Sequence, residues 1–169
     1  VLDEVGLAVA AKVAATLESS FGERFAVPAA LARLEEDRRL GRRAGRGFFV
    51  WDKAERKPDG SVYALMPGGA HRHAVDLHEI RDRILFALVN EAVLCFEDGI
   101  PRSARDGDSG AVFGFGFPAH LGGPFHYLDS LGARFAVEVL ERLAARHGSR
   151  FTAAPMLQDM ARTKWAFYA

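Results

Sequence analysis

The sequence predicts an all-α fold with one small β-hairpin, built around a duplicated helical unit. Apolar residues recur at helical spacing in several long segments, and one of these segments occurs twice at a fixed separation. The clearest strand-like run is short and covers residues 48–51. Strand signals are weak elsewhere in the chain.

Glycine, proline and aspartate mark the ends of the expected helices. Residues 5–21 carry apolar side chains on one helical face, and Gly22 is well placed to end this helix. Pro28 opens a second, shorter helix whose charged outer face continues to Arg39. Asp76 can cap a third helix that runs to about residue 97. Its buried face is expected to comprise Ile80, Ile84, Leu88, Val93 and Phe96.

Three further helices are expected in the second half of the chain. A short one covers residues 103–113 and is followed by a run of glycine and aromatic residues that ends at Pro118. A long helix starts at Gly122-Gly123-Pro124 and reaches about residue 147. A last short helix begins near Pro155.

The segment of residues 41–47 is rich in arginine and glycine and breaks the helical pattern. The turn signal Asp59-Gly60 predicts that residues 61–63 form the hairpin partner of residues 48–51. Residues 66–73 are expected to form a loop. The expected organisation is the end of a first helical copy plus the Arg/Gly-rich loop over residues 1–52, a linker over 53–75, and a second helical copy over 76–169.

An internal repeat supports this organisation, because residues 2–25 and 128–151 match without a gap at an offset of 126. The identical residues are Leu2, Asp3, Gly6, Ala10, Val13, Leu17, Gly22, Arg24 and Phe25, which recur as Leu128, Asp129, Gly132, Ala136, Val139, Leu143, Gly148, Arg150 and Phe151. Chance explains agreement between apolar helix positions, but shared Gly, Asp and Arg at equal spacing are uncommon by chance. We therefore predict two copies that pack against each other, because neither can bury its apolar face alone.

The repeat continues more loosely, since Gly47-Phe48-Phe49 corresponds to Ala166-Phe167-Tyr168. The first copy is already half finished where the chain begins, and the first residue is Val1 rather than methionine. Both features lead us to expect a further part of the protein upstream.

Composition favours a cytoplasmic protein. Lys+Arg and Asp+Glu both number 22, so the net charge is zero and no overall field attracts nucleic acid or an anionic membrane. The longest apolar run, residues 84–89, is too short to span a bilayer, and no signal peptide is visible. The single cysteine, Cys95, cannot form an internal disulfide, and we expect it in the core rather than as a nucleophile.

The Arg/Gly-rich loop is the main candidate for an anion site. Guanidinium groups bind phosphate in a forked geometry, and glycines let backbone N–H groups approach an anion. Arg42, Arg43 and Arg46 are therefore candidate substrate-binding residues for a phosphate-bearing ligand. An equally weighted alternative is a solvated turn paired with the acidic residues 35–37. An RNA backbone would also fit the loop, but it is the weaker hypothesis because no extended basic face continues from it.

Other polar groups have structural explanations. His71, His73 and His78 lack support from cysteine or a paired carboxylate motif, so a polar loop is favoured over a metal site. Asp106 and Asp108 are expected to be turn and N-cap residues rather than an acid/base pair. These residues therefore supply no catalytic group and no metal site.

Two Gly-x-Gly runs, residues 45–47 and 114–116, are not dinucleotide fingerprints. Val50 stands where the first would need its third glycine, and the second meets Pro118. Neither lies between a strand and a helix of a βαβ unit. We therefore expect that the chain does not bind NAD by itself.

The most specific string is Gly116-Phe117-Pro118 followed by Gly122-Gly123-Pro124. With residues 106–110 before it, this string resembles the C-terminal domain of 3-hydroxyacyl-CoA dehydrogenases, above all the second copy in the α subunit of the bacterial fatty acid oxidation complex. Residues 41–49 resemble the loop between the copies, where Arg43 and Phe49 replace the usual Lys and Tyr. The likeness covers nearly the whole chain.

The resemblance implies a fold like the C-terminal domain of 6-phosphogluconate dehydrogenase. It also implies a role in oxidising (3S)-3-hydroxyacyl-CoA with NAD, in fatty acid β-oxidation. In that family a His–Glu pair in an upstream Rossmann domain transfers the proton, and an Asn in an Asn-Arg motif of the first copy completes the site. The second copy has Asp82-Arg83 at this position, and an ionised Asp cannot donate a hydrogen bond as an amide does.

The resemblance therefore implies a helical portion that covers the first copy, supports acyl-CoA binding and assembly, and is inactive by itself. The implied partners are the acyl-CoA substrate, the upstream Rossmann domain that holds NAD, and as candidates a hydratase domain and a thiolase β subunit. The alternative is a stand-alone interaction or scaffold module of the same fold, without enzymatic activity.

Overall fold

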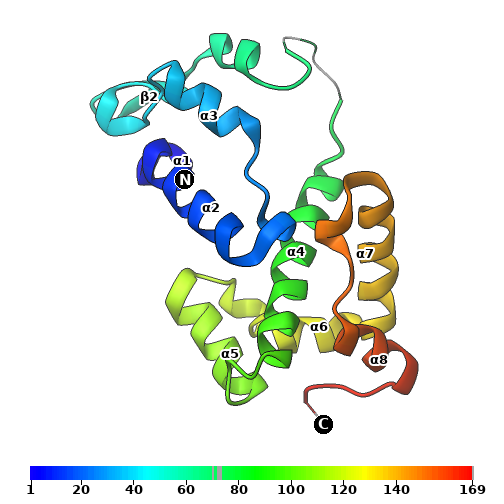
Figure 1. The fold of residues 1–169 in the computed structure, drawn as a ribbon. Helices are drawn as coiled ribbons and strands as arrows, with labels where there is room; N and C mark the ends of the chain where they lie inside the picture. Colours follow the sequence, from blue (N-terminus) through cyan, green and yellow to red (C-terminus); the bar gives the residue numbers. More distant parts are fainter. Residues whose placement is uncertain (70, 72–73, 169) are drawn as a thin grey trace. The chain divides into compact units, whose positions relative to one another are not determined.

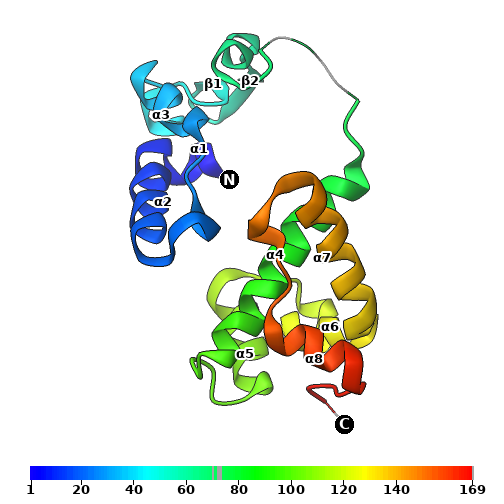
Figure 2. The same ribbon diagram turned by 45° about the vertical axis from the view of Figure 1, so that its right-hand side comes forward.

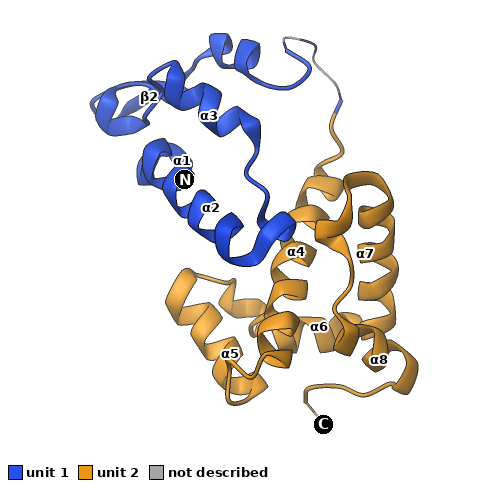
Figure 3. Ribbon diagram, in the orientation of Figure 1, with its two compact units in different colours: residues 1–74 blue, residues 75–169 orange. Residues whose placement is uncertain are grey.

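The computed structural model describes residues 1–69, 71 and 74–168. The chain divides into two compact units, unit 1 at Val1–Ala74 and unit 2 at Val75–Ala169 (Figure 3). Helices make up most of the described chain, which contains one two-stranded antiparallel sheet. This confirms the predicted all-α class with a single small hairpin.

Unit 1 is built around a helix pair and a hairpin (Figure 1). Its core consists of Leu7, Leu34 and Val62, against which partly buried residues such as Leu31 and Phe48 pack. Its elements are α1 (Leu2–Val5), α2 (Leu7–Phe21), the 3-10 helix η1 (Gly22–Phe25), α3 (Ala29–Glu36), the 3-10 helix η2 (Arg42–Ala44), β1 (Phe49–Asp52), β2 (Glu55–Pro58) and the 3-10 helix η3 (Gly60–Leu65).

The predicted hairpin partner is wrong. β1 pairs with β2, from Phe49 opposite Pro58 to Asp52 opposite Glu55, so the turn lies at residues 53–54. Residues 61–63, the predicted partner, lie in η3 instead. The Asp59 side chain accepts a hydrogen bond from the Ser61 N–H, so the Asp59-Gly60 pair starts a helix and not a hairpin turn. Much of the segment expected as a linker, residues 53–75, thus belongs to unit 1.

Unit 2 is a set of helices around the long helix α4 (Leu77–Glu97), which contacts α6, α7 and α8 (Figure 2). Its core includes Val93, Leu128, Leu140 and Leu157, each fully buried. The other elements are α5 (Ala104–Gly110), the π-helix η4 (Ala111–Phe115), the 3-10 helix η5 (Ala119–Leu121), α6 (Pro124–Leu131), α7 (Ala133–His147), the 3-10 helix η6 (Ser149–Phe151) and α8 (Pro155–Thr163).

Helix α4 starts as predicted, because the Asp76 carboxylate accepts the His78 N–H at 2.9 Å. Its buried face matches the prediction at Val93, and Phe96 packs against the core, but the rest of the face differs. Ile80 and Ile84 are 39% and 67% exposed, and the buried residues are Phe86, Val89, Asn90 and Val93. Asn90 helps to fix this orientation, because its amide donates to the Thr152 carbonyl and accepts the Ala154 N–H.

The internal repeat is present in the backbone. Helices α1 and α6 end at Gly6 and Gly132, which have φ values of 101° and 83°. Helices α2 and α7 follow directly, are both 15 residues long, and end at Gly22 and Gly148, with φ values of 68° and 92°. Glycine suits all four positions because positive φ strains other residues. A short 3-10 helix then follows in each copy, η1 and η6.

One side-chain interaction also recurs. The Asp3 carboxylate accepts the backbone N–H groups of Phe48 and Phe49 at 2.9 and 3.0 Å. The Asp129 carboxylate accepts those of Phe167 and Tyr168 at 3.1 and 2.8 Å. The structure therefore confirms that the two segments, including their loosely matching ends, are copies of one unit.

Candidate functional site

Arg39 holds the Arg/Gly-rich loop in place and is fully buried. Its guanidinium donates to the Gly47 carbonyl at 2.7 Å and pairs with Asp59 at 2.9 Å and with Asp37 at 2.8 Å. A buried arginine needs such pairing, because an unpaired buried charge is strongly destabilising. Arg39 is therefore committed to the fold of unit 1 and is not available to a ligand.

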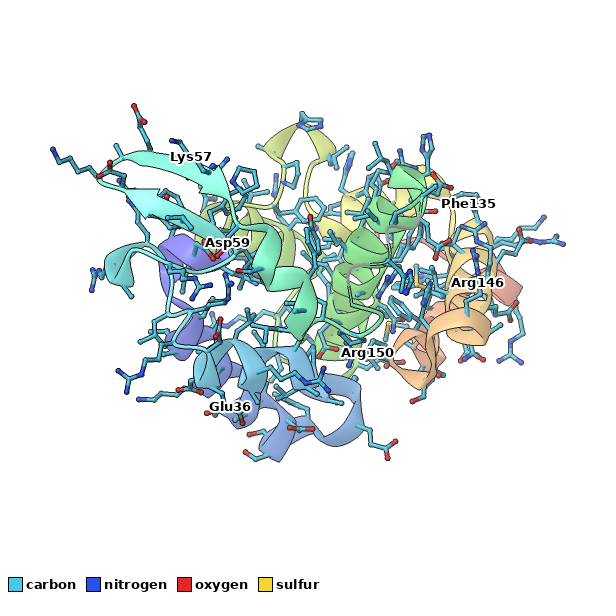
Figure 4. All side chains as sticks on the ribbon, turned by 90° about the horizontal axis from the view of Figure 1, so that it is seen from above. Glu36, Lys57, Asp59, Phe135, Arg146 and Arg150 are labelled. Carbon is cyan, nitrogen blue, oxygen red and sulfur yellow. The ribbon has the colours of Figure 1, made fainter. Side chains whose placement is uncertain are left out.

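Arg46 and Arg42, two of the three predicted ligand-binding residues, have acidic partners in unit 1. Arg46 pairs with Asp59 at 3.1 Å, and Arg42 pairs with Glu4 at 2.9 Å. The Arg42 guanidinium also lies 5.2 Å from the ring centroid of Trp51. Figure 4 shows Asp59 close to the hairpin residue Lys57. The predicted pairing with acidic residues 35–37 holds in part, because Asp37 lies 3.7 Å from Arg46.

Asp59 is the acidic centre of this network. Hydrogen bonds from the Ser61 hydroxyl and N–H, and from Arg46 and Arg39, hold the pKa of the Asp59 carboxyl well below its usual range. Asp59 therefore stays ionised and offsets the charges of Arg39 and Arg46.

Arg43 differs from its neighbours. It is exposed, and within the described part of the chain its side chain makes no hydrogen bond or ion pair. Residues 37–59 carry eight Arg or Lys against four Asp or Glu, so the surface around Arg43 keeps a positive excess. Of the three predicted residues, Arg43 is the one best placed to meet an anionic ligand.

The glycines of this loop do not form a dinucleotide site. The Gly45 N–H donates to the Arg42 carbonyl and the Gly47 N–H to the Phe49 carbonyl, so both are used within the loop. Gly47 also lies against Asp3, and a Cβ at Gly47 would overlap the Asp3 carboxylate. The sheet beside it is an antiparallel hairpin and not a βαβ unit. This loop therefore does not fit NAD.

The Gly-Gly-Pro string surrounds a second buried carboxylate, Asp108. Its oxygens accept the N–H groups of Phe125 at 2.8 Å and His126 at 3.1 Å, in the first turn of α6. Gly123 has a φ of 109°, and a Cβ there would overlap the Asp108 side chain. The prediction that Asp108 is an N-cap residue is therefore wrong, because it lies within α5 and the N-cap of α6 is Gly123. Its side chain nevertheless accepts the first-turn N–H groups of α6.

A shallow cavity of about 260 Å³ lies beside Asp108 and is lined by Arg105, Ser109, Phe113, His126 and Tyr168 among others. Phe113 belongs to the π-helix η4 and is 88% exposed. Polar and aromatic groups thus meet here, but Asp108 and Tyr168 are bonded to each other. The glycine-rich run next to it, residues 114–116, is again not a strand-to-helix turn.

A His–Glu pair that sequence reasoning missed lies at one end of unit 2. His147 Nε2 is 2.8 Å from Glu79 Oε1, and the Arg146 guanidinium pairs with the same carboxylate. This pairing lowers the pKa of Glu79. Glu79 begins α4 and His147 ends α7, which is the arrangement that helix dipoles favour. We interpret the pair as a structural link between helix ends.

Asp82, which stands where the resemblance implies an Asn, is also committed to ion pairs. Its carboxylate pairs with Arg142 at 3.0 Å and with Arg81 at 3.2 Å. Both oxygens of the Asp82 carboxylate thus accept hydrogen bonds from arginines.

Three histidines and Cys95 are the remaining candidates from the sequence. His71 and His78 are exposed, and His73 lies outside the described residues. Among residues 1–69, 71 and 74–168, no group of three His, Cys, Asp or Glu side chains is arranged to hold a metal ion. Cys95 is half-buried on α4. No described helix is both long and apolar enough to cross a membrane.

Comparison with known proteins gives a consistent result. Residues 80–166 match the family model described as "3-hydroxyacyl-CoA dehydrogenase, C-terminal domain". The chain is 48% identical to the fatty acid oxidation complex subunit alpha of Shewanella sp. (strain ANA-3), and 46% identical to that of Idiomarina loihiensis. Both alignments cover 99% of this chain but only 24% of the relative.

The chain therefore spans about a quarter of the length of these curated relatives. The family model covers more than half of the chain, including the Gly-Phe-Pro and Gly-Gly-Pro strings and the helices α4 to α8. On these grounds, this chain belongs to the 3-hydroxyacyl-CoA dehydrogenase C-terminal domain family.

Proposed function

We propose that this chain is the C-terminal helical part of an NAD-dependent 3-hydroxyacyl-CoA dehydrogenase of fatty acid β-oxidation. The observation that carries the proposal is the family match over residues 80–166, on a structure whose two halves share one helical design. Its role is to support acyl-CoA binding and the assembly of domains or subunits. Oxidation and proton transfer belong to a nucleotide-binding domain elsewhere in the protein.

The contacts of the polar residues support this division of labour. Asp82, Glu79 and His147 are engaged in ion pairs between helices. The carboxylates of Asp108 and Asp129 accept hydrogen bonds from backbone N–H groups. These five groups are thus used to fix the positions of helices and of the segment after α8, which favours a supporting role over a catalytic one for them.

The proposal is tested with the 169-residue chain and the complete gene product, assayed side by side with acetoacetyl-CoA and NADH. We expect turnover by the complete gene product and none by the 169-residue chain. NADH oxidation by the chain alone, proportional to its concentration, would overturn the proposed division of labour.

For the Arg/Gly-rich loop, the proposed ligand is the phosphate part of acyl-CoA. The exposed, unpaired Arg43 carries this proposal, because Arg42 and Arg46 already have carboxylate partners. The prediction that tests the loop is given in the Discussion.

A stand-alone scaffold module is the second candidate. It rests on the same ion-paired residues, which would serve a purely structural protein equally well. Activity of the complete gene product distinguishes the two, because a scaffold module would oxidise no NADH in any form.

A further inference from the structure

Unit 2 has a cavity of about 350 Å³ at the junction between α6 and α7. It lies where the end of α8 packs near this junction, since α8 is in contact with α7 (Figure 2). Its volume falls within the range of about 300 to 1,000 Å³ that is usual for ligand pockets. The residues of its lining that matter here are Gly132, Ala133, Arg134, Met160, Lys164 and Trp165. We refer to it as the α7 cavity.

The corresponding place in unit 1 is filled by the Arg/Gly-rich loop. At the offset of 126, the junction between α6 and α7 corresponds to the junction between α1 and α2 at Gly6. There the Leu40 carbonyl accepts the Leu7 N–H at 3.1 Å. Gly41 lies directly against the Asp3 carbonyl, which would be 2.6 Å from an added Cβ. A chain segment thus closes the start of α2.

Unit 2 has a much shorter connection at this place. Residues 37–46 separate α3 from Gly47 in unit 1, whereas only Lys164 and Trp165 separate α8 from Ala166, the counterpart of Gly47. Among the residues that the structure describes, no group accepts a hydrogen bond from the Ala133 N–H, which corresponds to that of Leu7. Unit 2 therefore keeps the donor and the space but lacks the acceptor.

The charges at the two junctions are opposite. In unit 1 the acidic Glu4 lies at the junction and pairs with Arg42 of the loop at 2.9 Å. In unit 2 the lining of the α7 cavity carries the basic side chains of Arg134 and Lys164. A basic loop suits the acidic junction of unit 1, so the α7 cavity suits an acidic segment.

Both basic residues of the α7 cavity can accept a new partner. Arg134 reaches Glu138 at 3.3 Å, but both side chains are exposed, so this ion pair contributes little. Lys164 makes no ion pair within the described part of the chain. The carboxylate of Asp129, which also lines the cavity, is already occupied by two backbone N–H groups. The lining thus carries two cations against one carboxylate.

We propose that the α7 cavity binds an acidic peptide segment of a partner chain. A backbone carbonyl of this segment accepts the Ala133 N–H, as the loop carbonyl does in unit 1. An aliphatic side chain beside that carbonyl packs on Met160 and on Trp165, which is 49% exposed. An Asp or Glu in the following residues pairs with Arg134 and Lys164. This inference deepens the assembly role proposed above and rests on it.

The direct test uses the complete gene product and two labelled peptides derived from residues 38–43 of the loop, Arg-Arg-Leu-Gly-Arg-Arg. In the acidic peptide, Glu replaces each arginine, and in both peptides photo-leucine replaces the leucine. Fluorescence anisotropy measures binding, and mass spectrometry locates the crosslinks. We expect saturable binding of the acidic peptide, binding of the basic peptide that is weaker by about tenfold or more, and crosslinks to residues 160–165.

Three results would overturn the proposal. These are no saturable binding of the acidic peptide, equal binding of the two peptides, and crosslinks that lie only in other parts of the protein. A cavity already filled by another segment of the same protein would give the first of these results.

Charge variants test the role of the two cations. Arg134→Glu and Lys164→Glu should each weaken binding of the acidic peptide about tenfold, because each loses a charge-assisted hydrogen bond. Arg162→Glu is the matched control, since Arg162 is exposed on α8 and does not line the cavity. An equal loss of binding in Arg162→Glu would reveal unspecific attraction and contradict the proposed site.

Ala133→Pro tests the backbone hydrogen bond alone. Proline is well tolerated at the first position of a helix, and Gly132 before it has a ψ of 133°, which suits a following proline. The variant should weaken peptide binding about fivefold and leave the melting temperature unchanged. Ala133→Ser keeps the N–H and should bind as the unmodified protein does. Unchanged binding in Ala133→Pro would refute the hydrogen bond to the peptide carbonyl.

These measurements separate the inference from the proposed function, because neither binding nor crosslinking requires turnover. A gene product that oxidises NADH but does not bind the acidic peptide would refute this inference alone. One that binds the peptide in the α7 cavity but oxidises no NADH would refute the proposed dehydrogenase function alone.

Discussion

The hydroxyl of Tyr168 donates a hydrogen bond to Asp108 Oδ2 at 2.7 Å, across 60 positions of sequence. The same carboxylate accepts the N–H groups of Phe125 and His126 at the start of α6. Asp108 is 4% exposed, so water cannot easily replace these bonds. One buried carboxylate thus joins α5, α6 and the segment after α8.

Replacing Asp108 tests its importance for unit 2. We expect Asp108→Ala to lower the free energy of unfolding by about 2 kcal/mol, because it leaves buried N–H groups without an acceptor. Urea unfolding followed by circular dichroism measures the change. Asp106→Ala is the matched control, since Asp106 lies exposed on the same helix. Equal losses in the two variants would show that Asp108 has no special role.

Tyr168 gives unit 2 a dependence on alkaline pH. Burial, and then the hydrogen bond to Asp108, raise the pKa of Tyr168 from 10.0 to about 12. A group with a raised pKa in the folded state stabilises the fold below its unfolded pKa. Here that stabilisation is complete below pH 10 and is lost as the pH rises towards about 12.

We therefore expect the free energy of unfolding to fall less between pH 10 and pH 12 in Tyr168→Phe than in the unmodified chain. At pH 8 the variant should be less stable by about 1 kcal/mol, the usual contribution of one hydrogen bond. Urea titrations at several pH values measure both effects, with the exposed Tyr63→Phe as control. Parallel curves for the variant and the unmodified chain would refute the assignment.

A substitution at Gly47 tests whether the Asp3 carboxylate has a fixed position in unit 1. A Cβ at position 47 would overlap that carboxylate, which is fixed by the N–H groups of Phe48 and Phe49. Gly47→Ala should therefore lower the free energy of unfolding by about 2 kcal/mol, as overpacking does elsewhere. At Gly60 an added Cβ would meet nothing within 4 Å, so Gly60→Ala should have little effect. A harmless Gly47→Ala would contradict the fixed position of Asp3.

In the Arg/Gly-rich loop, we expect one substitution to affect acyl-CoA binding and another to affect stability. In the complete gene product, Arg43→Glu should raise the KM for acyl-CoA about tenfold, the usual effect of losing a charge-assisted hydrogen bond. Its melting temperature should not change, because Arg43 has no partner to lose in the described residues. Arg46→Glu should lower the melting temperature, because it opposes Asp59. An unchanged KM in Arg43→Glu would dismiss the ligand role.

Glu79 predicts a response to acid. Its hydrogen bond to His147 and its nearness to Arg146 lower its pKa from the usual 4.5. A lowered pKa stabilises the fold above the unfolded value, and this stabilisation is lost as the pH falls through the folded value. The free energy of unfolding should thus fall less below pH 4.5 in Glu79→Gln than in the unmodified chain. Glu141→Gln, on an exposed position of α7, serves as the control.

Periodicity and glycine positions were sufficient to predict most of the helices, since these signals are local. The single long helix predicted from residue 124 to about residue 147 is wrong, because Gly132, with a φ of 83°, divides it into α6 and α7. The buried face of α4 could not be predicted in this way, because apolar residues occur on several sides of this helix. The polar residue Asn90 lies on the buried side and forms hydrogen bonds with the backbone of residues 152 and 154. No local sequence pattern predicts these hydrogen bonds. The prediction of the hairpin partner was wrong for a related reason. The pair Asp59-Gly60 can start a helix as well as form a hairpin turn.

The sequence predicted which arginines belong to the candidate site, but not which carboxylates they pair with. The sequence shows a cluster of arginines, yet it does not show which of them face carboxylates. Arg39 and Arg46 meet Asp59, which lies on the far side of the hairpin in sequence. The link between Glu79 and His147 spans 68 residues and has no motif to reveal it. Long-range partners of this kind depend on tertiary packing.

The carboxylates of Asp3 and Asp129 each find their N–H partners inside their own unit. A mutation in one half of the molecule therefore does not break the corresponding hydrogen bonds in the other half. The two halves also differ at matching sites, since Arg142 in one corresponds to Thr16 in the other. Because each half keeps its own hydrogen bonds, a substitution that suits a structural role in one half does not disturb the other half.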